Sequence, residues 1–151
     1  IYHIQKIIDK KDWKSVIVFG NSAGGYMAIL TSCLLNNVTK TLVFSPVVCL
    51  EGNYVQENHG MDEIIKLEKE GNIRYKDVNK FLYKLKNSLH IYYDPKNYTD
   101  NKNINRLNFN QHVKTFYVDA EGNHNVIYYL YKSNQLHSII SDAIDKNYRS
   151  S

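Results

Sequence analysis

The hydrophobic positions of the chain fall into short apolar runs separated by longer segments with a helical repeat. Residues 16–19 form a continuous run of β-branched and aromatic residues, as is typical of a parallel strand buried on both faces. Further strands are predicted over 41–44, 89–93 and 114–118. Strands that alternate with helical segments predict an α/β fold, in which a mostly parallel sheet is flanked by helices.

The stretch between the second and third predicted strands is longer than a simple crossover needs. Residues 61–70 have apolar positions at helical spacing, and Gly71 with Asn72 provides a stop. Asp77 can cap a second helix. The apolar face of that helix comprises Val78, Phe81, Leu82 and Leu85.

Composition limits the classes of partner and cofactor. The 151 residues are 43% hydrophobic, enough for one domain that buries roughly two thirds of its unfolded surface. No apolar run reaches the roughly 18 residues of a membrane span, so no transmembrane helix is predicted. The net charge is +4, but the lysines are scattered and no nucleic-acid-binding motif occurs, so nucleic acid is not predicted as a partner. Cys33 and Cys49 are expected to be buried free thiols, which favours a reducing, cytoplasmic location.

The segment from Gly20 to Gly25 contains the pattern G-x-S-x-G between a predicted strand and a predicted helix. This pattern indicates a nucleophile elbow, in which Ser22 takes a strained backbone conformation at a sharp turn. We expect Ser22 at the carboxyl edge of the sheet, with the Ala23 N–H aimed at an oxyanion. Side chains two residues either side of Ser22 would collide, so glycine is expected to be required at Gly20 and Gly24. The alternative is an ordinary turn in which Ser22 only caps the helix.

Six histidines compete for the role of general base. His124 follows a predicted strand and opens the next helix, so its ring can reach the edge of the sheet beside Ser22. Packing or surface positions are expected for the other five: His3, His59, His90, His112 and His137. No H-x-x-x-H or H-x-x-E-H cluster occurs, so neither a metal nor another cofactor is predicted.

The acid that orients the histidine should emerge from the loop after the third predicted strand. Asp100 lies where this loop descends toward His124, and its alternative role is to cap a helix. Asp94 leaves the strand directly before Pro95, a position typical of a turn residue. We predict Asp100 as the acid and keep Asp94 open. Two more distant candidates are Asp119 and Glu121.

These motifs resemble the α/β-hydrolase superfamily, and the segment 20–25 is similar to the elbow of its esterases. The second strand ends in Ser45-Pro46, and the order nucleophile, acid, histidine is that of the superfamily. A narrower resemblance is to bacterial hydrolases found with surface-polysaccharide and glycosyltransferase genes. Its motifs are Tyr92-Tyr93, Asp100 with Arg106-Leu107, and His124-Asn125-Val126 with Tyr129-Leu130.

The resemblance covers the C-terminal half of the superfamily fold, because only one helix-like segment, 1–13, precedes the elbow strand. It implies a partial α/β-hydrolase fold in which 50–88 is a small helical cap insertion; two ordinary packing helices are the alternative. The chain begins at Ile1 rather than Met, so we expect a piece of a longer protein whose second oxyanion donor lies upstream. Alone, it is expected to be inactive, and to form a homodimer or associate with a missing N-terminal segment.

The resemblance implies a serine hydrolase, a carboxylesterase that cleaves an O-acyl ester on a small molecule or a glycan. Ser22, His124 and Asp100 are the predicted triad, and Ala23 supplies an oxyanion donor. Two other functions stay open at this point: an acyltransferase with a sugar acceptor, and a non-catalytic hydrolase-like module that binds a glycan or a partner.

Overall fold

Four parallel strands form a single sheet in the computed structural model, which describes residues 1–51 and 62–145. The strands are β1 Ile17–Asn21, β2 Lys40–Phe44, β3 Ser88–Tyr93 and β4 Val113–Tyr117. Their order across the sheet is β1-β2-β3-β4, so β1 and β4 are its edges. The predicted α/β class and the four predicted strands are confirmed, with shifts of one or two residues at some of their ends.

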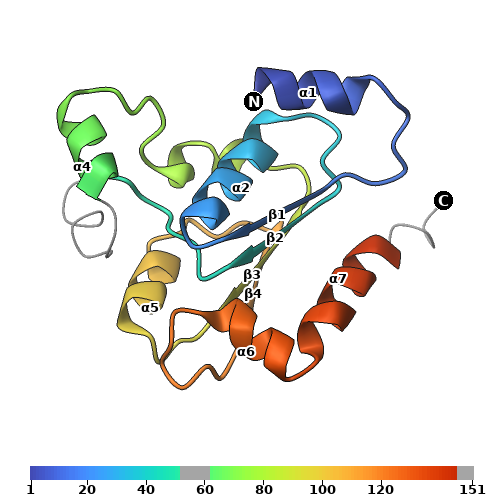
Figure 1. Ribbon diagram of the computed structural model, residues 1–151. Coiled ribbons are helices and arrows are strands. Elements are labelled where there is room, and N and C mark those ends of the chain that lie inside the picture. The colour runs from blue at the N-terminus through green and yellow to red at the C-terminus, as the bar shows by residue number, and fades with distance from the viewer. Residues whose placement is uncertain (52–61, 146–151) are drawn as a thin grey trace.

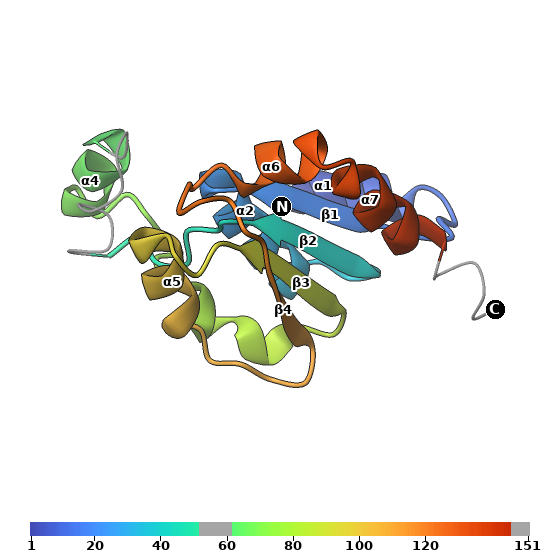
Figure 2. The same ribbon diagram turned by 90° about the horizontal axis from the view of Figure 1, so that it is seen from below.

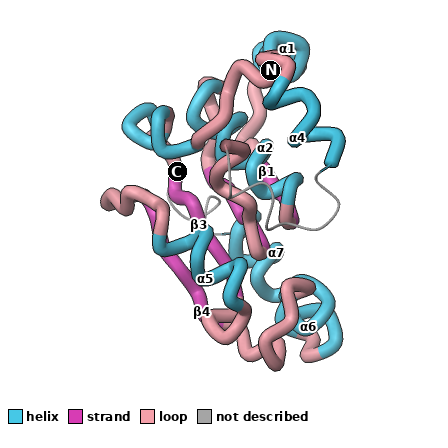
Figure 3. The backbone as a smooth tube through the Cα atoms, turned by 90° about the vertical axis from the view of Figure 1, so that its left-hand side faces the viewer, coloured by secondary structure: helices cyan, strands magenta, loops and turns pink. Residues whose placement is uncertain are grey.

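Helices cover both faces of this sheet (Figures 1 and 2). The helix α2 Ala23–Leu34 lies on one face, and α6 Val126–Lys132 and α7 Gln135–Asp145 lie on the other. The described residues also form the α-helices α1 Tyr2–Asp9, α4 Asp62–Lys69 and α5 Tyr98–Asn105. Figure 3 views the molecule from the carboxyl ends of the strands, around which α4, α5 and α6 are arranged.

The alternation of side chains along β2 divides the core into two clusters. Val43 points into the cluster built with Ile29 of α2, while Leu42 and Phe44 join the cluster under α6 and α7. All five residues of β2 are buried, as a strand covered on both faces requires. The burial of each such apolar side chain stabilises the fold by roughly 1.5–3 kcal/mol.

The helix predicted over 61–70 is observed as α4, with Met61 outside the described residues. It ends as expected: Gly71 has a φ of 73°, and the N–H of Asn72 donates to Leu67 O over 2.9 Å. No residue of α4 is buried, and the helix stands beyond the carboxyl end of the sheet (Figures 1 and 2). The interpretation of 50–88 as a cap stays a prediction.

The second helix predicted in this stretch is observed as two short 3₁₀ helices, with the predicted cap and apolar side chains in place but without one continuous helix. Asp77 does accept a hydrogen bond from the Asn79 N–H at 2.9 Å, but two short 3₁₀ segments follow, η1 Val78–Lys80 and η2 Leu82–Lys84. The reason lies in tertiary contacts. The Asn79 side chain donates to the Arg106 carbonyl and accepts from the Asn108 N–H, which ties this turn to the loop after α5 and competes with a continuous helix.

Apolar side chains remain exposed near the β1 edge of the sheet. Phe19 on β1 is 45% exposed, and Tyr2, Ile4 and Ile7 are exposed on α1. The expectation that the chain self-associates or binds a further segment stays a prediction. Within the described ranges, no helix has both the length and the apolar character needed to cross a membrane.

Candidate active site

Ser22 occupies a sharp turn between β1 and α2. Its φ of 51° and ψ of −119° lie outside the regions that non-glycine residues prefer, at a cost of order 1–3 kcal/mol. Backbone bonds hold this conformation: the Ser22 N–H donates to Phe44 O at 2.9 Å, and Ser22 O accepts from the N–H groups of Gly25 and Val47. The Ser22 side chain makes no capping hydrogen bond, which argues against the alternative of a simple helix cap.

Glycine is required at two positions around the elbow, one of which the sequence analysis missed. A Cβ on Gly20 would lie 2.2 Å from Gly24 O, as expected for the crossing of strand and helix. The prediction for Gly24 is wrong, because a Cβ there meets no heavy atom within 4 Å. Gly25 is the second required glycine: its Cβ would lie 2.8 Å from Pro46 Cβ, so α2 packs against the loop after β2 only without a side chain.

The three residues predicted as a triad lie together in one hydrogen-bond path. His124 Nε2 is 2.9 Å from Ser22 Oγ, and His124 Nδ1 is 2.5 Å from Asp100 Oδ1. Each ring nitrogen of His124 therefore faces a different partner: Ser22 lies 102 positions earlier in the chain, and Asp100 lies 24 positions earlier. The sheet makes this possible, because β1, β3 and β4 end at the same edge and the loops that follow them converge there.

Asp100 is positioned by α5 and by a residue that the sequence analysis did not select. Its side chain is 1% exposed, and its second oxygen accepts a hydrogen bond from Ser45 Oγ at 2.6 Å. Asn97 caps α5 by accepting from the Asp100 N–H at 2.9 Å. Ser45 is fully buried and has a φ of 41° directly after β2. Its place at a strand end beside a proline was the only sequence signal for it.

Asp94, the alternative acid, serves the loop rather than the histidine. Its two oxygens accept from the backbone N–H groups of Lys96, Ala120 and Gly122 over 2.8–2.9 Å. Burial acts to raise the pKa of Asp94, but these N–H donors outweigh it and hold the pKa below its usual value. Both oxygens are thus engaged with backbone donors, and Asp94 ties the turn after β3 to the loop that leads to His124.

That loop is held on its other side by α5. Asn97 Nδ2 donates to the Gly122 carbonyl at 2.8 Å, and positive φ angles at Glu121 and Gly122 turn the chain toward His124. Asp119 is exposed and forms an ion pair with Lys96 at 2.8 Å. Among the four acidic candidates, only Asp100 hydrogen-bonds to the histidine in the described structure.

The hydrogen bond that His124 donates to Asp100, together with the negative charge of Asp100, raises the pKa of His124 above its ordinary value, and partial burial of the ring opposes this shift. The raised pKa means that the imidazolium form is stabilised in this site. A histidine at this position therefore takes up a proton readily, because the buried carboxylate of Asp100, 1% exposed, stabilises the resulting positive charge.

The side chains that flank the elbow differ in role. Tyr26 is 3% exposed, and its hydroxyl donates to Tyr75 O at 2.5 Å, so it ties α2 to the chain after α4. Asn21 Oδ1 is buried without a hydrogen-bond partner within the described residues.

One group of ligand-type side chains lies close together in the described residues, formed by Cys49, Glu51 and Asp77. Asp77 is bound in an ion pair with Arg106 at 2.7 Å, and burial raises the pKa of the Cys49 thiol and disfavours its thiolate.

Both cysteines, Cys33 and Cys49, are free and buried, as the sequence predicted. His59 lies outside the described residues.

Comparison with solved structures identifies the fold. An alpha/beta hydrolase enzyme from the metagenome of sediments of the Mar Chica lagoon, Morocco, is similar with a TM-score of 0.59 and 18% identity, over 95% of this chain and 68% of that one. An esterase from Pyrococcus furiosus has a TM-score of 0.56 and 15% identity, over 95% and 59%. A puromycin-hydrolyzing peptidase from Mycobacterium tuberculosis has a TM-score of 0.53 and 10% identity, over 86% and 22%.

The chain has an α/β-hydrolase-like fold, since its sheet and flanking helices match these structures over most of its length. It spans 68%, 59% and 22% of the lengths of these three neighbours. No protein-family model matches the sequence, and no curated protein matches it. At these identities the likeness defines the fold, and the activity is a separate question.

Proposed function

We propose that this chain carries the catalytic residues of a serine carboxylesterase, with Ser22 as nucleophile, His124 as general base and Asp100 as the acid that orients the histidine. The observation that carries the proposal is the path from Ser22 Oγ through both ring nitrogens of His124 to Asp100, at 2.9 and 2.5 Å. This arrangement suits acyl transfer by a serine, because the acid holds the histidine proton on Nδ1 and leaves Nε2 free to accept the proton of the hydroxyl.

In the first step, Ser22 Oγ bonds to the carbonyl carbon of the ester while its proton passes to His124 Nε2. The carbonyl π electrons move to oxygen and form a tetrahedral oxyanion. Asp100 stabilises the imidazolium through Nδ1–H. The N–H of Ala23, at the first position of α2, has no acceptor within its own helix and supplies a donor to the oxyanion.

In the second step, the oxyanion collapses and the bond to the alcohol oxygen breaks. The alcohol leaves with the proton from His124 Nε2, and the acyl group remains on Ser22. Water then gives a proton to the same nitrogen and attacks the acyl carbon; the bond from that carbon to Ser22 Oγ breaks, His124 Nε2 returns the proton to Oγ, and a carboxylic acid is released. One water is consumed for each ester, and one alcohol and one acid are produced.

The substrate class that we propose is an O-acyl ester on a glycan or a small molecule. Support comes from the resemblance of the chain to hydrolases found with surface-polysaccharide genes, and from an esterase among the proteins that share its fold. If a sugar hydroxyl replaces water in the second step, the same residues act as an acyltransferase. A cytoplasmic location also stays a prediction.

A fluorophosphonate probe and a short-chain ester, 4-nitrophenyl acetate, test the proposal on the protein. We expect the probe to label Ser22 alone, because it reacts with an activated serine hydroxyl, and we expect Ser22→Ala to abolish both labelling and turnover. Ser133→Ala is the matched control, since Ser133 is exposed and its hydroxyl donates to the backbone of α6. Labelling that persists in Ser22→Ala would contradict the proposal.

The products separate the remaining functions. Release of free acetate at the same rate with and without an added sugar supports hydrolysis, whereas an acetylated sugar identifies a transferase. If a folded protein that includes any missing segment neither reacts with the probe nor cleaves any short-chain ester, the result would favour a non-catalytic binding module.

A further inference from the structure

A hollow lies beside α2, the helix that begins directly after Ser22. It has a volume of about 400 Å³, within the range of roughly 300–1,000 Å³ typical of small-molecule sites. We call it the α2 hollow. Most of the side chains that line it are apolar or aromatic, among them Tyr26, Met27, Leu30, Leu50, Ile64 and Ile73. Its polar lining residues, Asn72 and Arg74, are both exposed.

Tyr26 forms a fixed wall of the α2 hollow. Its side chain is 3% exposed, and its hydroxyl donates to Tyr75 O at 2.5 Å. The Tyr75 ring, which also lines the hollow, packs edge-on against the Phe81 ring with the ring centres 5.3 Å apart. These contacts hold the wall in place, so it exists before a ligand binds.

A row of residues on α2 leads from the candidate active site to the hollow. Ala23, Met27 and Leu30 are spaced four and three residues apart, so their side chains share one side of the helix. Leu30 follows Ser22 by eight residues, about 12 Å along the helix axis. Ala23 and Gly24 are exposed, and a Cβ on Gly24 would meet no heavy atom within 4 Å. The first turn of α2 is therefore open on the side that leads to Met27.

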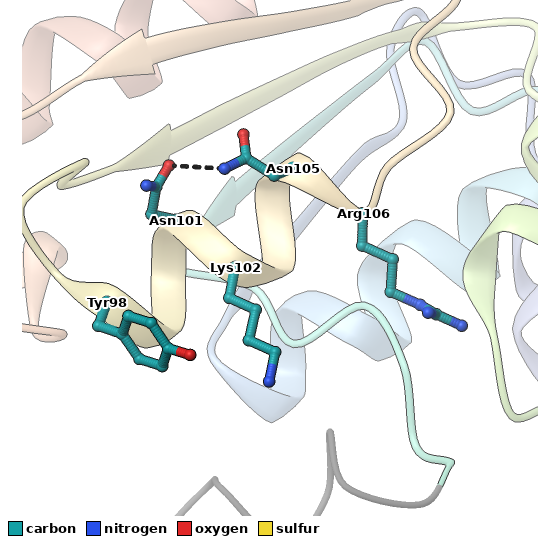
Figure 4. A pocket seen from close by; sticks show the side chains of 5 residues that line it. All are labelled: Tyr98, Asn101, Lys102, Asn105 and Arg106. Carbon is teal, nitrogen blue, oxygen red and sulfur yellow. Dashed lines mark hydrogen bonds between the residues drawn. The ribbon is translucent and has the colours of Figure 1, made fainter.

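A second hollow, of about 380 Å³, lies along the exposed side of α5 and has a different chemistry (Figure 4). It is lined by Tyr98, Asn101, Lys102, Asn105 and Arg106. Asn105 donates to Asn101 at 3.3 Å, and Arg106 forms an ion pair with Asp77 at 2.7 Å. An apolar chain that covered these polar groups would remove water from them without replacing its hydrogen bonds. Such a chain prefers the α2 hollow, where it contacts apolar side chains.

We propose that the α2 hollow binds the acyl chain of the ester, and that this chain is a medium-length aliphatic chain such as octanoyl. With the carbonyl carbon at Ser22 Oγ and its oxygen at the Ala23 N–H, the chain passes over Gly24 and lies against Met27 and Leu30. Complete burial of one CH₂ group is worth about fourfold in binding, so an octanoyl chain gains more than a butanoyl chain. Cleavage of the bound chain rests on the proposed function, whereas binding of the chain does not.

Binding is measured by calorimetry on the Ser22→Ala protein, with octanamide and butanamide as probes. Both are neutral, carry the same carbonyl group and differ only in chain length, so charged side chains do not select between them. We expect octanamide to bind about tenfold or more tightly than butanamide, because the hollow covers CH₂ groups that the shorter chain lacks.

The variants Met27→Trp and Ile64→Trp fill the α2 hollow and should each weaken octanamide binding by about tenfold. Met27 is 51% exposed and Ile64 is not buried, so we expect both variants to fold with an unchanged melting temperature. Asn105→Trp is the matched control: it places the same side chain at an exposed position of the α5 hollow and should leave octanamide binding unchanged.

The proposal is overturned if octanamide binds no more tightly than butanamide, or if both hollow-filling variants bind octanamide as the Ser22→Ala protein does. It is also overturned if Asn105→Trp weakens binding as much as they do, because the chain would then lie elsewhere or fail to distinguish the two hollows.

Kinetics separate this proposal from the proposed function. In the protein with Ser22 intact, kcat/KM for 4-nitrophenyl octanoate should exceed that for 4-nitrophenyl butyrate by about tenfold or more, and Met27→Trp should bring the ratio close to one. If both esters are cleaved at equal kcat/KM, the α2 hollow is not the acyl site and the proposed function stands. If octanamide binds as expected but neither ester is cleaved and no probe labels Ser22, the proposed function alone is refuted.

Discussion

Replacing Asp100 by asparagine tests the proposed catalytic path most directly. The carboxylate is 1% exposed and accepts one hydrogen bond on each oxygen, from His124 Nδ1 at 2.5 Å and from Ser45 Oγ at 2.6 Å. Asparagine has the same shape but lacks the charge, and its amide nitrogen donates where one oxygen accepted. The effect depends on which partner the amide nitrogen faces.

If the amide nitrogen faces His124, the ring must accept at Nδ1 and carries its proton on Nε2, so it cannot take the Ser22 proton. The serine-protease precedent for this change is a fall of about ten-thousandfold in turnover, or about 5.4 kcal/mol. If the nitrogen faces Ser45, the tautomer is kept and a charge-assisted hydrogen bond of about 1.5–3 kcal/mol is lost, which corresponds to about ten- to 150-fold. We therefore expect a fall of at least about tenfold that can reach ten-thousandfold.

The measurement is kcat/KM for 4-nitrophenyl acetate, together with the rate of fluorophosphonate labelling, on proteins with matched melting curves. Asp119→Asn is the control and should change neither rate, because Asp119 is exposed and pairs with Lys96. A variant Asp100→Asn within about threefold of the unaltered protein would refute the reasoning. If Asp94→Asn then lost the activity, the role of the acid would pass to Asp94.

Three further outcomes follow from the site and the elbow. Because the pKa of His124 is raised and only the neutral ring accepts a proton, kcat/KM should rise with pH around a midpoint above about 6.5, and Asp100→Asn should lower this midpoint. Asp94→Asn should leave one backbone N–H without an acceptor and lower the free energy of unfolding by about 1–3 kcal/mol. Thermal melting should show a Tm decrease of about 2–4 °C for each kcal/mol lost, while turnover of the folded protein stays nearly unchanged. Gly25→Ala should destabilise by about 1–3 kcal/mol in denaturant unfolding while Gly24→Ala is tolerated; the reverse ranking would contradict the packing described for the elbow.

The class of fold and the position of the elbow could be predicted because their signals are local. A continuous apolar run forms a buried strand wherever it lies, and the pattern around Ser22 needs only a strand before it and a helix after it. His124 was predicted for a related reason, since a residue after the last strand of a parallel sheet emerges at the edge where Ser22 stands.

The choice between the two aspartates depended on tertiary structure. Asp94 and Asp100 lie in the same connection after β3, and either could face the histidine by sequence alone. The structure turns Asp94 toward three backbone N–H groups and Asp100 toward His124 and Ser45. The partners of each carboxylate come from segments remote in sequence, so no local pattern records them.

The sequence by itself determined the order of the strands, the sharp turn at Ser22 and the connection that holds the two candidate aspartates, because each depends on neighbouring residues. Tertiary structure decided the need for glycine at position 25, the replacement of a predicted helix by two 3₁₀ segments, and the partner of each carboxylate. These depend on close contacts between elements: Gly25 meets Pro46 only because α2 lies against the end of β2, and Asn79 is bound by the loop after α5. Close packing and the pairing of buried polar groups are properties of the assembled chain.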